Sequence, residues 1–468
     1  MIARNPLEVL LKYDQQVPRY TSYPPAPHFN RSPEEIRALE MVDGSNLTGP
    51  WNASLYIHIP FCPKRCHFCG CHTEIGRPGS AVRDYMETLM LEAEFLIPHI
   101  QAERPVTQIH FGGGTPNAAP FGAIKALLDK FRVRLSVEPD AEIAMECDPN
   151  LITADRIREL DRMGFTRLSF GIQDFDLRVL QAVNRRFPKT EPKELFRVCR
   201  ELGMSGNNLD LIYGLPYQNP AGFRETIDKA IDADPDRISL FPYAHVPWIK
   251  GHQAILDPLP MPDAATRLEM AWAAREALEQ AGYEVIGMDH FAKPSDELAA
   301  AARDGSLHRN FQGYCHAGRA GQVYGIGASA ISQVHEGYLQ NTKDLEDYSA
   351  LVRMGRPAWK SGYRMRPEDI AVRAVLNGIL SAGSADLQAA FDEAGVPVEW
   401  RRHYLATSLE RLKPYLEDEL VTVNDGKVRL QGHGRYVARI VAAAFDPLLG
   451  APFRAAEASA APRYSRAL

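Results

Sequence analysis

The sequence contains no apolar run that approaches the length of a membrane span, and Met1–Val17 carries charges where a signal peptide needs an unbroken apolar core. It also lacks an excess of positive charge, because the formal net charge is −6. No global basic field is present to attract nucleic acid or an anionic membrane, so an anionic ligand has to be bound locally. We expect a cytoplasmic protein without a membrane span or a nucleic-acid partner.

Cysteine is scarce as well, with seven in 468 residues, and it is unevenly placed. Cys62, Cys66, Cys69 and Cys71 are crowded together, whereas the other three cysteines, Cys147, Cys199 and Cys315, stand alone. In a reducing compartment a tight group of cysteines indicates a metal site and not a disulfide framework. The remaining composition, 45% hydrophobic and 24% charged, is typical of a globular chain that buries its own core.

Short β-rich runs alternate with helical patterns over much of the chain. The predicted strands are 55–59, 108–111, 142–146, 167–171, 208–213 and 237–243, with 283–287 as a further strand, and the predicted helices include 83–96, 154–163 and 190–202. This alternation favours parallel strands with right-handed crossovers, hence an α/β fold built on a partial (β/α)6 TIM-like barrel. In such barrels the chemistry lies on loops after the strands, where the cysteines and Gly112-Gly113-Gly114 are found.

The pattern changes near Met365. Helices are predicted at 369–380, 384–394 and 404–412, and the runs 420–423 and 428–430 flank an Asp-Gly turn typical of a β-hairpin. We therefore predict an N-terminal extension over residues 1–50 that covers the active site and a barrel with its extension over 51–360. A mainly helical C-terminal domain with a β-wing follows over 365–468.

Cys62-Pro-Lys-Arg-Cys66-His-Phe-Cys69 follows the first predicted strand directly. Three thiolates on one loop can hold a compact four-iron cluster and leave one iron without a protein ligand. An open coordination position admits a ligand that reacts, whereas a structural site fills all its positions. The alternative is a zinc site with Cys71 as the fourth ligand, although the Cys69-Gly-Cys71 spacing is tight for tetrahedral zinc.

The CxxxCxxC spacing after a strand resembles the radical S-adenosylmethionine superfamily. The resemblance implies that Cys62, Cys66 and Cys69 bind a [4Fe–4S] cluster whose open iron chelates S-adenosylmethionine, which is cleaved to a 5′-deoxyadenosyl radical. It also implies that Phe68 lies near the adenine and that the triple glycine binds the methionine amino group, because glycine lets the backbone approach a ligand closely.

Further motifs narrow the resemblance: Arg19-Tyr20-Thr21-Ser22-Tyr23-Pro24, Tyr56–Cys62, Asp210–Pro216, Gly287–Ala292, His308–Tyr314 and Tyr464-Ser465-Arg466. Together they resemble the oxygen-independent coproporphyrinogen III oxidase (coproporphyrinogen dehydrogenase) family, from about Tyr13 to the last residues. The resemblance implies two molecules of S-adenosylmethionine and a catalytic role for Tyr56 and Glu146 beside the three cysteines. The cofactor-binding residues that it implies are Tyr56, Phe68, Gly113, Gly114, Thr115, Glu146, Gln173, Arg185, Asp210, Ala244, Phe311, Gln312 and Ile331.

The implied reaction converts two propionates of coproporphyrinogen III to vinyl groups and gives protoporphyrinogen IX. Hydrogen is removed from the carbon next to the pyrrole ring, and the substrate radical then loses an electron and carbon dioxide. The protein has to position the substrate and exclude water, and it needs no strong base. Arg19 and Arg309 are candidates to pair with propionates, since arginine binds carboxylates through two hydrogen bonds. The implied partners are the porphyrinogen and a separate one-electron donor, and we expect a monomer.

Several alternatives stay open at this point. Glu146 could cap the helix that follows it, Arg185 could be a surface charge and Asp210 a structural partner. A paralogue acting on another substrate by methyl transfer, cyclopropanation or ring opening would share the same motifs. A haem-delivery chaperone is the non-enzymatic alternative, although such relatives usually lack the N-terminal Arg-Tyr-Thr-Ser-Tyr-Pro segment.

One stretch departs from the family pattern. After Gly313-Tyr314, where two threonines are expected, the chain reads Cys315-His316-Ala317-Gly318-Arg319-Ala320-Gly321-Gln322, with one residue more than expected. We interpret this stretch as lineage variation in a surface loop. The alternative is altered substrate recognition or a different radical outcome, in which Cys315 and His316 quench a substrate radical or accept hydrogen from it.

Overall fold

The computed structural model describes residues 6–449 and 464–467. At its centre six strands lie side by side in chain order, and each pairs in parallel with the next. They are β1 (Ala53–Ile59), β4 (Pro105–Gly113), β5 (Ser136–Cys147), β6 (Arg167–Gln173), β7 (Asn208–Tyr213) and β8 (Arg237–Pro242). The predicted α/β fold is confirmed, and the ends of these parallel strands meet at one edge of the sheet.

The sheet continues beyond both sides of these six strands. Next to β1 come parallel β13 (Gln322–Ile326) and then antiparallel β14 (Ile331–Val334), β15 (Gly337–Asn341) and β16 (Trp359–Arg364). Next to β8 come antiparallel β10 (His290–Ala292) and β9 (Glu284–Ile286), so the strand predicted at 283–287 is an edge strand. A separate hairpin, β11 (Leu307–Asn310) with β12 (Gly313–His316), follows helix α10 (Glu297–Asp304).

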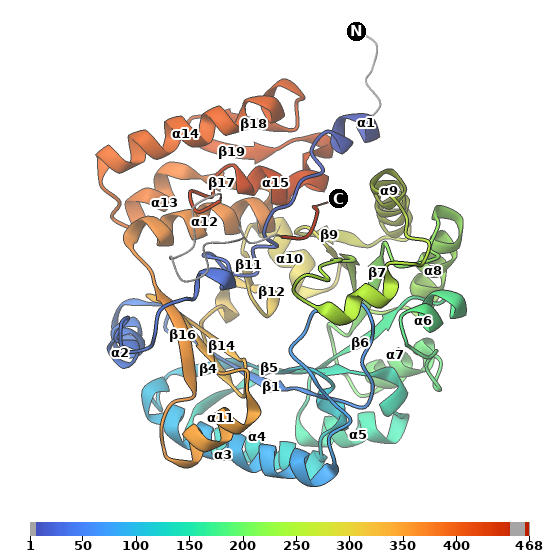
Figure 1. Cartoon of the computed structure of the whole chain (residues 1–468), viewed down its shortest axis with the longest axis vertical. Helices are drawn as coiled ribbons and strands as arrows, with labels where there is room; N and C mark the ends of the chain where they lie inside the picture. Colours follow the sequence, from blue (N-terminus) through green and yellow to red (C-terminus); the bar gives the residue numbers. More distant parts are fainter. Residues whose placement is uncertain (1–5, 450–463, 468) are drawn as a thin grey trace.

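Helices between the strands form an outer layer, and Figure 1 shows α3, α4 and α5 along one face of the sheet. The helices of this part are α2 (Ala38–Thr48), α3 (Gly79–Ile100), α4 (Phe121–Arg134), α5 (Ala154–Met163), α6 (Leu177–Ala182), α7 (Pro192–Glu201), α8 (Pro220–Asp232), α9 (Ala264–Gln280) and α11 (Leu345–Arg353). The fully buried strand residues Leu55, Ile57 and Phe111 belong to the main core beneath these helices. Among the described residues, no helix is long and apolar enough to cross a membrane.

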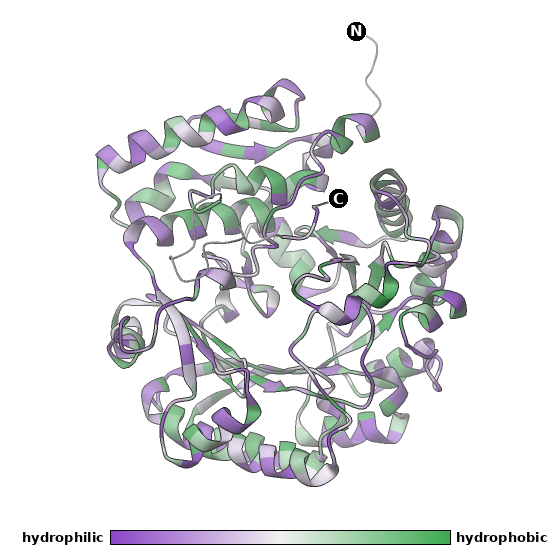
Figure 2. Cartoon of the chain, in the orientation of Figure 1, coloured by the Kyte–Doolittle hydropathy of each residue, from purple (hydrophilic) through white to green (hydrophobic). Residues whose placement is uncertain are grey.

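The C-terminal part is mainly helical, with a small sheet. Its helices are α12 (Pro367–Ala382), α13 (Leu387–Glu393), α14 (Val398–Glu417) and α15 (Ala438–Ala443), and its strands are β17 (Ser384–Asp386), β18 (Val421–Asn424) and β19 (Lys427–Leu430). Asp425 and Gly426 both have positive φ angles, 49° and 74°, as a two-residue hairpin turn requires. In Figure 2 α12 is largely hydrophobic, whereas the outer helix α14 is largely hydrophilic.

The helix predicted over 384–394 is wrong at its start. Ser384–Asp386 pairs with β19 as a third strand, and the helix begins only at Leu387. The physical reason is the pairing with β19, and the Asp386 side chain then caps the helix by accepting a hydrogen bond from the backbone N–H of Ala389, 3.0 Å away.

The N-terminal segment contacts both cores. Residues of and after α1 (Pro6–Leu11), namely Leu10, Val17, Tyr20 and Tyr23, are buried with the C-terminal helices, whereas Ile36, Met41 and Val42 are buried in the core of the sheet. The two ends of the chain also meet, because Gln16 forms a β-bridge with Arg466. The division at 1–50, 51–360 and 365–468 stays a prediction.

Candidate functional site

The cysteine loop starts where β1 ends. Strand β2 (Phe61–Cys62) pairs in parallel with β3 (Glu74–Ile75) and thereby closes the loop at its base. Cys62, Cys66 and Cys69 are partly buried, Cys71 is exposed, and all have free thiols. The four cysteines line one cavity of about 380 Å³ at the carboxyl ends of the barrel strands. The thiols therefore lie where a parallel barrel carries its chemistry.

Polar donors are directed at two of the sulfur atoms. Thr115 Oγ1 lies 3.2 Å from Cys62 Sγ, and Arg185 Nη1 lies 3.4 Å from Cys66 Sγ. Burial raises the pKa of the Cys62 thiol to about 11 and also raises the pKa of Cys66, whereas a hydrogen bond from Cys71 lowers the pKa of Cys69 to about 6. Buried thiols become thiolate ligands beside a cation such as iron, and these donors stabilise the resulting charge.

The glycines after β4 bring the backbone directly against the cysteine loop. A Cβ on Gly114 would lie 2.5 Å from the Pro60 carbonyl oxygen and 3.0 Å from Cys62 Sγ, and Gly113 has a φ of +116°. Only glycine fits such a cradle. Among the described residues, no group of three or more His, Cys, Asp or Glu is gathered closely enough to hold a single metal ion. Cys62, Cys66 and Cys69 line one cavity, and polar donors lie within hydrogen-bond distance of two of their sulfur atoms, so the residues present fit a cluster held by thiolates.

Glu146 belongs to the cavity and does not cap a helix. Its carboxylate accepts a hydrogen bond from the Gly113 N–H at 3.0 Å, and His110 Nε2 lies 3.2 Å away. Burial alone would raise the pKa of Glu146, but the hydrogen bonds from His110 and Gly113 hold it below its usual range. The short helix that follows is capped by Asp148, which accepts a hydrogen bond from the Asn150 N–H. The helix-cap interpretation of Glu146 is therefore wrong.

Arg185 is not a surface charge either. Its side chain is 12% exposed, donates to the carbonyl oxygen of Gly171 and lies 3.9 Å from Asp148. Gln173, at the end of β6, has a φ of +74° and lines the same cavity. Both residues thus lie beside the thiols.

Asp210 on β7 combines the two roles considered for it. It accepts hydrogen bonds from Ser169 Oγ at 3.0 Å and Asn208 Nδ2 at 2.8 Å, and it also lines the cavity. Burial raises the pKa of its carboxyl group. Asp210 is therefore both a structural partner and a cavity residue.

Most of the predicted site residues come together in this cavity. Phe68, Gly113, Gly114, Thr115, Glu146, Gln173, Arg185, Asp210 and Gln312 line it with the cysteines. Tyr56 stacks on His110 with ring centroids 5.9 Å apart, and Phe311 meets Tyr56 edge-on at 5.3 Å. His110 was missed, although its place on β4 just before the triple glycine is a usable signal.

Four predicted residues, Tyr56, Phe311, Ala244 and Ile331, are not among those that line this cavity, and Phe311 lines a neighbouring cavity instead. The carbonyl oxygen of Ala244 accepts a hydrogen bond from Gln253 Nε2 at 3.2 Å, and the same nitrogen donates to the Phe68 carbonyl oxygen at 2.9 Å. Ala244 is thus tied to the cysteine loop from behind. Ile331, on β14, packs against the cluster of Phe29, Tyr338 and Met365. Neither residue is among those lining the cysteine cavity.

A second cavity, of about 360 Å³, adjoins the first and is rich in arginine. The two cavities share Phe241, His290, Gln312, Gly313 and Tyr314 as walls. The arginines that line the second cavity are Arg19, Arg275, Arg309, Arg435 and Arg439. Three of these, Arg275, Arg435 and Arg439, were missed, because they belong to segments that only the fold brings together.

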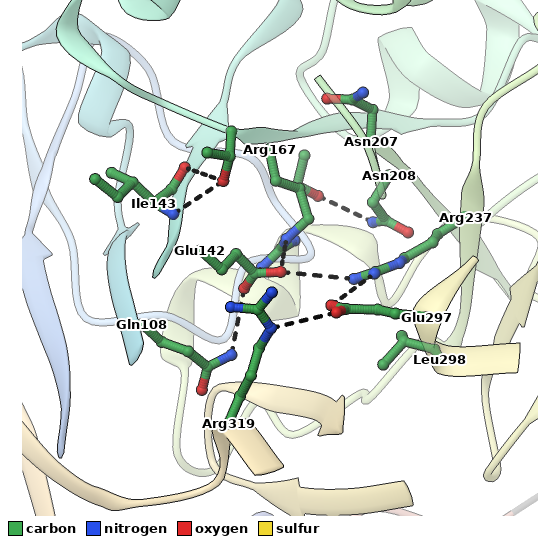
Figure 3. Close-up of polar contacts among 12 residues, drawn as sticks. Gln108, Glu142, Ile143, Arg167, Asn207, Asn208, Arg237, Glu297, Leu298 and Arg319 are labelled. Carbon is green, nitrogen blue, oxygen red and sulfur yellow. Dashed lines mark hydrogen bonds and ion pairs between the residues drawn. The ribbon is translucent and has the colours of Figure 1, made fainter. Parts of the chain in front are cut away.

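The segment 315–322 is not the surface loop that we expected. Cys315 and Gln322 are buried, in β12 and β13, and only Ala317 and Gly318 are exposed. Arg319 points towards the amino ends of the barrel strands, where its Nε lies 3.3 Å from Glu297 (Figure 3). The segment is therefore a partly exposed turn between two buried strand residues, and burial raises the pKa of the Cys315 thiol to about 12.

Figure 3 shows a network of charged side chains at this end of the barrel. Glu142 pairs with Arg167 at 2.9 Å and lies 3.9 Å from Arg237, and Arg237 pairs in turn with Glu297 at 3.3 Å. Arg167 and Arg237 are the first residues of β6 and β8. The ion pairs therefore link β5, β6 and β8 to the start of α10.

Comparisons with known proteins agree with this geometry. The family model described as the radical SAM superfamily matches residues 56–230. The oxygen-independent coproporphyrinogen III oxidase of Salmonella typhimurium is 37% identical over 95% of both chains, and that of Synechocystis is 38% identical over 94% of this chain and 95% of its own.

Among solved structures, coproporphyrinogen III oxidase (HemN) from Escherichia coli, described as a radical SAM enzyme, superposes with a TM-score of 0.84. It is 34% identical to this chain, and the match covers 94% of this chain and 98% of the other. Similarity of this extent confirms the resemblance seen in the motifs: the chain belongs to the oxygen-independent coproporphyrinogen III oxidase family of the radical SAM superfamily.

Proposed function

We propose that this chain catalyses the oxygen-independent oxidative decarboxylation of two propionates of coproporphyrinogen III, which gives protoporphyrinogen IX in haem biosynthesis. The observation that carries the proposal is the adjacency of the two cavities. One is lined by three thiols and a glycine cradle, and the other by arginines, with Gln312 and Tyr314 in the shared wall. A substrate with four carboxylates suits the arginine-lined cavity, which we name the arginine cavity.

The cofactors are a [4Fe–4S] cluster and S-adenosylmethionine, which when bound supply a carbon-centred radical able to remove hydrogen from the substrate. We propose that Cys62, Cys66 and Cys69 hold the cluster. We also propose that Glu146 and the backbone of Gly113 bind the amino group of S-adenosylmethionine, since carboxylate and carbonyl oxygens accept hydrogen bonds from an ammonium ion.

The remaining predicted residues are assigned to positioning. Phe311 lines the arginine cavity and meets the ring of Tyr56 edge-on, which supports a role for this aromatic pair in excluding water from the radical. We propose that Phe311 and Gln312 contact a second molecule of S-adenosylmethionine and that Arg19 and Arg309 orient propionates. We propose that six further residues of the cavity lining complete the cofactor sites: Phe68, Gly114, Thr115, Gln173, Arg185 and Asp210. Ala244 and Ile331 would support these sites without lining the cavity.

We also propose that the enzyme is a cytoplasmic monomer that receives electrons from a separate one-electron donor. All seven cysteines are free thiols in the described structure, which suits a reducing compartment. The net charge of −6 offers no argument for an anionic macromolecular partner.

The test is an anaerobic assay of reconstituted, reduced enzyme with S-adenosylmethionine and coproporphyrinogen III. We expect protoporphyrinogen IX with the release of two molecules of carbon dioxide for each substrate molecule. A methylated or ring-opened tetrapyrrole would contradict the proposal in favour of a paralogue. Tight binding of finished haem with no cleavage of S-adenosylmethionine would contradict it in favour of a haem carrier.

A further inference from the structure

The arginine cavity has far more positive than negative charge. Five arginines line it, and Asp289 is the one acidic residue among the described residues of its lining. Asp289 is already engaged, because its carboxylate lies 2.8 Å from His290 Nδ1. The positive charges of Arg309 and Arg19 help to lower the pKa of Asp289, which locates all three groups near one another. One carboxylate cannot balance this many guanidinium groups.

The arginines of the cavity differ in whether other residues of the protein neutralise their charge. Arg275 Nε lies 3.3 Å from Glu279, one helical turn away, so its charge has a partner. Arg309 donates to the carbonyl oxygen of Tyr20 and lies over the ring of Tyr314, with 5.7 Å between Cζ and the ring centroid. Arg19 lies in the same way over the ring of Phe241, at 5.6 Å. These contacts hold Arg19 and Arg309 in place without neutralising them.

Arg439 is the most exceptional of the five. It lies on α15 and is 9% exposed, and its Nη2 donates to the carbonyl oxygen of Arg466 at 2.7 Å. Its Nε is buried without a hydrogen-bond partner, and no carboxylate of the described residues pairs with it. Burial and the nearby charge of Arg19 lower its pKa to about 10.

A buried guanidinium that faces another cation is unfavourable unless an anion completes the arrangement. Arg439 lines the arginine cavity, and guanidinium groups bind carboxylates with strong charge-assisted hydrogen bonds. The arginine cavity of about 360 Å³ offers the space for such a ligand. The missing counter-charge therefore belongs to a molecule that enters the cavity.

We propose that Arg439, together with Arg19, binds one propionate carboxylate of the tetrapyrrole and thereby selects substrates by their number of carboxylates. The identity of the ligand rests on the proposed function, whereas the need for an anion rests on the geometry. Arg439 is a binding residue in this proposal and takes no part in the radical chemistry. Because it belongs to the C-terminal part of the chain, that part contributes directly to substrate recognition.

The test titrates coproporphyrin III, the oxidised and unreactive form of the substrate, into cluster-loaded enzyme under anaerobic conditions and follows porphyrin fluorescence. We expect Arg439→Gln to raise the dissociation constant by about 10- to 100-fold, because one charge-assisted hydrogen-bonded contact is lost. Arg439→Lys keeps the positive charge and a donor for the carbonyl oxygen of Arg466. It loses the planar guanidinium group that can donate two parallel hydrogen bonds to a carboxylate, so an intermediate effect is expected. Arg429→Gln, an equal loss of charge at an exposed position on β19, is the matched control and should leave the dissociation constant unchanged.

The number of carboxylates separates recognition from a merely structural role. Protoporphyrin IX has two propionates in place of four. Arg439→Gln should therefore weaken the binding of coproporphyrin more than the binding of protoporphyrin, and equal weakening of both porphyrins would contradict selection by the number of carboxylates. The visible absorbance of the cluster should be unchanged in either case.

Unchanged binding of coproporphyrin by Arg439→Gln or by Arg439→Lys would overturn this inference while leaving the proposed function intact. Failure of the wild-type enzyme to bind or convert the tetrapyrrole would instead reject the proposed function. Loss of the cluster in the glutamine variant, combined with normal porphyrin binding by the lysine variant, would reduce Arg439 to a structural residue and reject the inference.

Discussion

The four thiols of the cysteine loop have different neighbours. Cys62 receives a hydrogen bond from Thr115, and Cys66 receives one from Arg185, whereas Cys71 is the exposed member of the group. A cluster that keeps one iron free for a reacting ligand needs three thiolates and not four. We therefore propose that Cys71 does not bind the cluster; it lowers the pKa of Cys69 through a hydrogen bond.

Alanine substitutions test this difference. Cys62→Ala, Cys66→Ala and Cys69→Ala should each abolish the visible absorbance of the reconstituted cluster and the cleavage of S-adenosylmethionine together, because each removes one ligand. Cys71→Ala should keep both, with at most a several-fold loss of rate. Absorbance spectra and iron content of anaerobically purified protein provide the measurement. An intact cluster in Cys66→Ala, or a lost one in Cys71→Ala, would mean that the ligands are assigned incorrectly.

Single elements show which features local sequence can predict. The strand periods, the Asp425-Gly426 turn and the spacing of the cysteines are local signals, and the structure has the corresponding strands, hairpin and loop. The start of the helix at 384–394 could not be predicted, because pairing with β19 decides it. A role for Arg439 could not be predicted from the sequence either, because its cavity is formed by segments that are far apart in the chain.

Glu92 links several elements through one buried carboxylate. It lies on α3 and accepts hydrogen bonds from the Gly327 N–H at 2.7 Å, Asn341 Nδ2 at 2.6 Å and Tyr348 Oη at 2.5 Å. Gly327 follows β13, Asn341 is the last residue of β15 and Tyr348 lies in α11. The Glu92 carboxylate therefore connects the outer helices α3 and α11 to the extension of the sheet. Burial raises the pKa of Glu92 to about 7 despite these hydrogen bonds.

The raised pKa of Glu92 predicts the direction of a pH effect. The folded protein holds this proton up to about pH 7, whereas an unfolded glutamate loses it near pH 4.5, so the stabilisation is complete below pH 4.5 and is lost as the pH rises through 7. Relative to Glu92→Gln, the wild type should lose up to about 3 kcal/mol of unfolding free energy across this range. Denaturant unfolding of both proteins at pH 5, 6, 7 and 8 measures the difference. A difference that stayed constant, or grew in favour of the wild type with rising pH, would contradict the assignment.

At the scale of the whole molecule, the two ends of the chain meet at the arginine cavity. Arg466 pairs with Asp14 at 2.7 Å, its carbonyl oxygen accepts a hydrogen bond from Arg439, and Ala467 is part of the cavity lining. Figure 1 shows the last residues running beside the N-terminal segment, below α15 and β19. Residues 464–467 thus help to hold Arg439 in the wall of the arginine cavity.

Shortening the chain to end at residue 463 should weaken substrate binding without disturbing the cluster. The Nη2 of Arg439 loses its carbonyl acceptor, which should raise the dissociation constant for coproporphyrin III by about 3- to 10-fold. Cluster absorbance should be retained, because none of the described lining of the cysteine cavity comes from the tail. Arg466→Ala keeps the backbone carbonyl and loses only the exposed ion pair, so it should bind nearly as well as the wild type. Equal losses in both proteins would show that the ion pair, and not the carbonyl, orders the cavity.

The arginine cavity is built from Arg19 near the start, Arg309 further along and Arg439 near the end, whereas the described lining of the cysteine cavity is complete at Tyr314. The thiols that we propose as iron ligands are therefore synthesised long before Arg439, the last residue that we propose to recognise the tetrapyrrole. A polypeptide whose translation stops early, or one that a protease cleaves after the sheet, would still contain the three cysteines proposed to bind the iron–sulfur cluster. Such a polypeptide would lack part of the arginine cavity that we propose to bind the porphyrinogen.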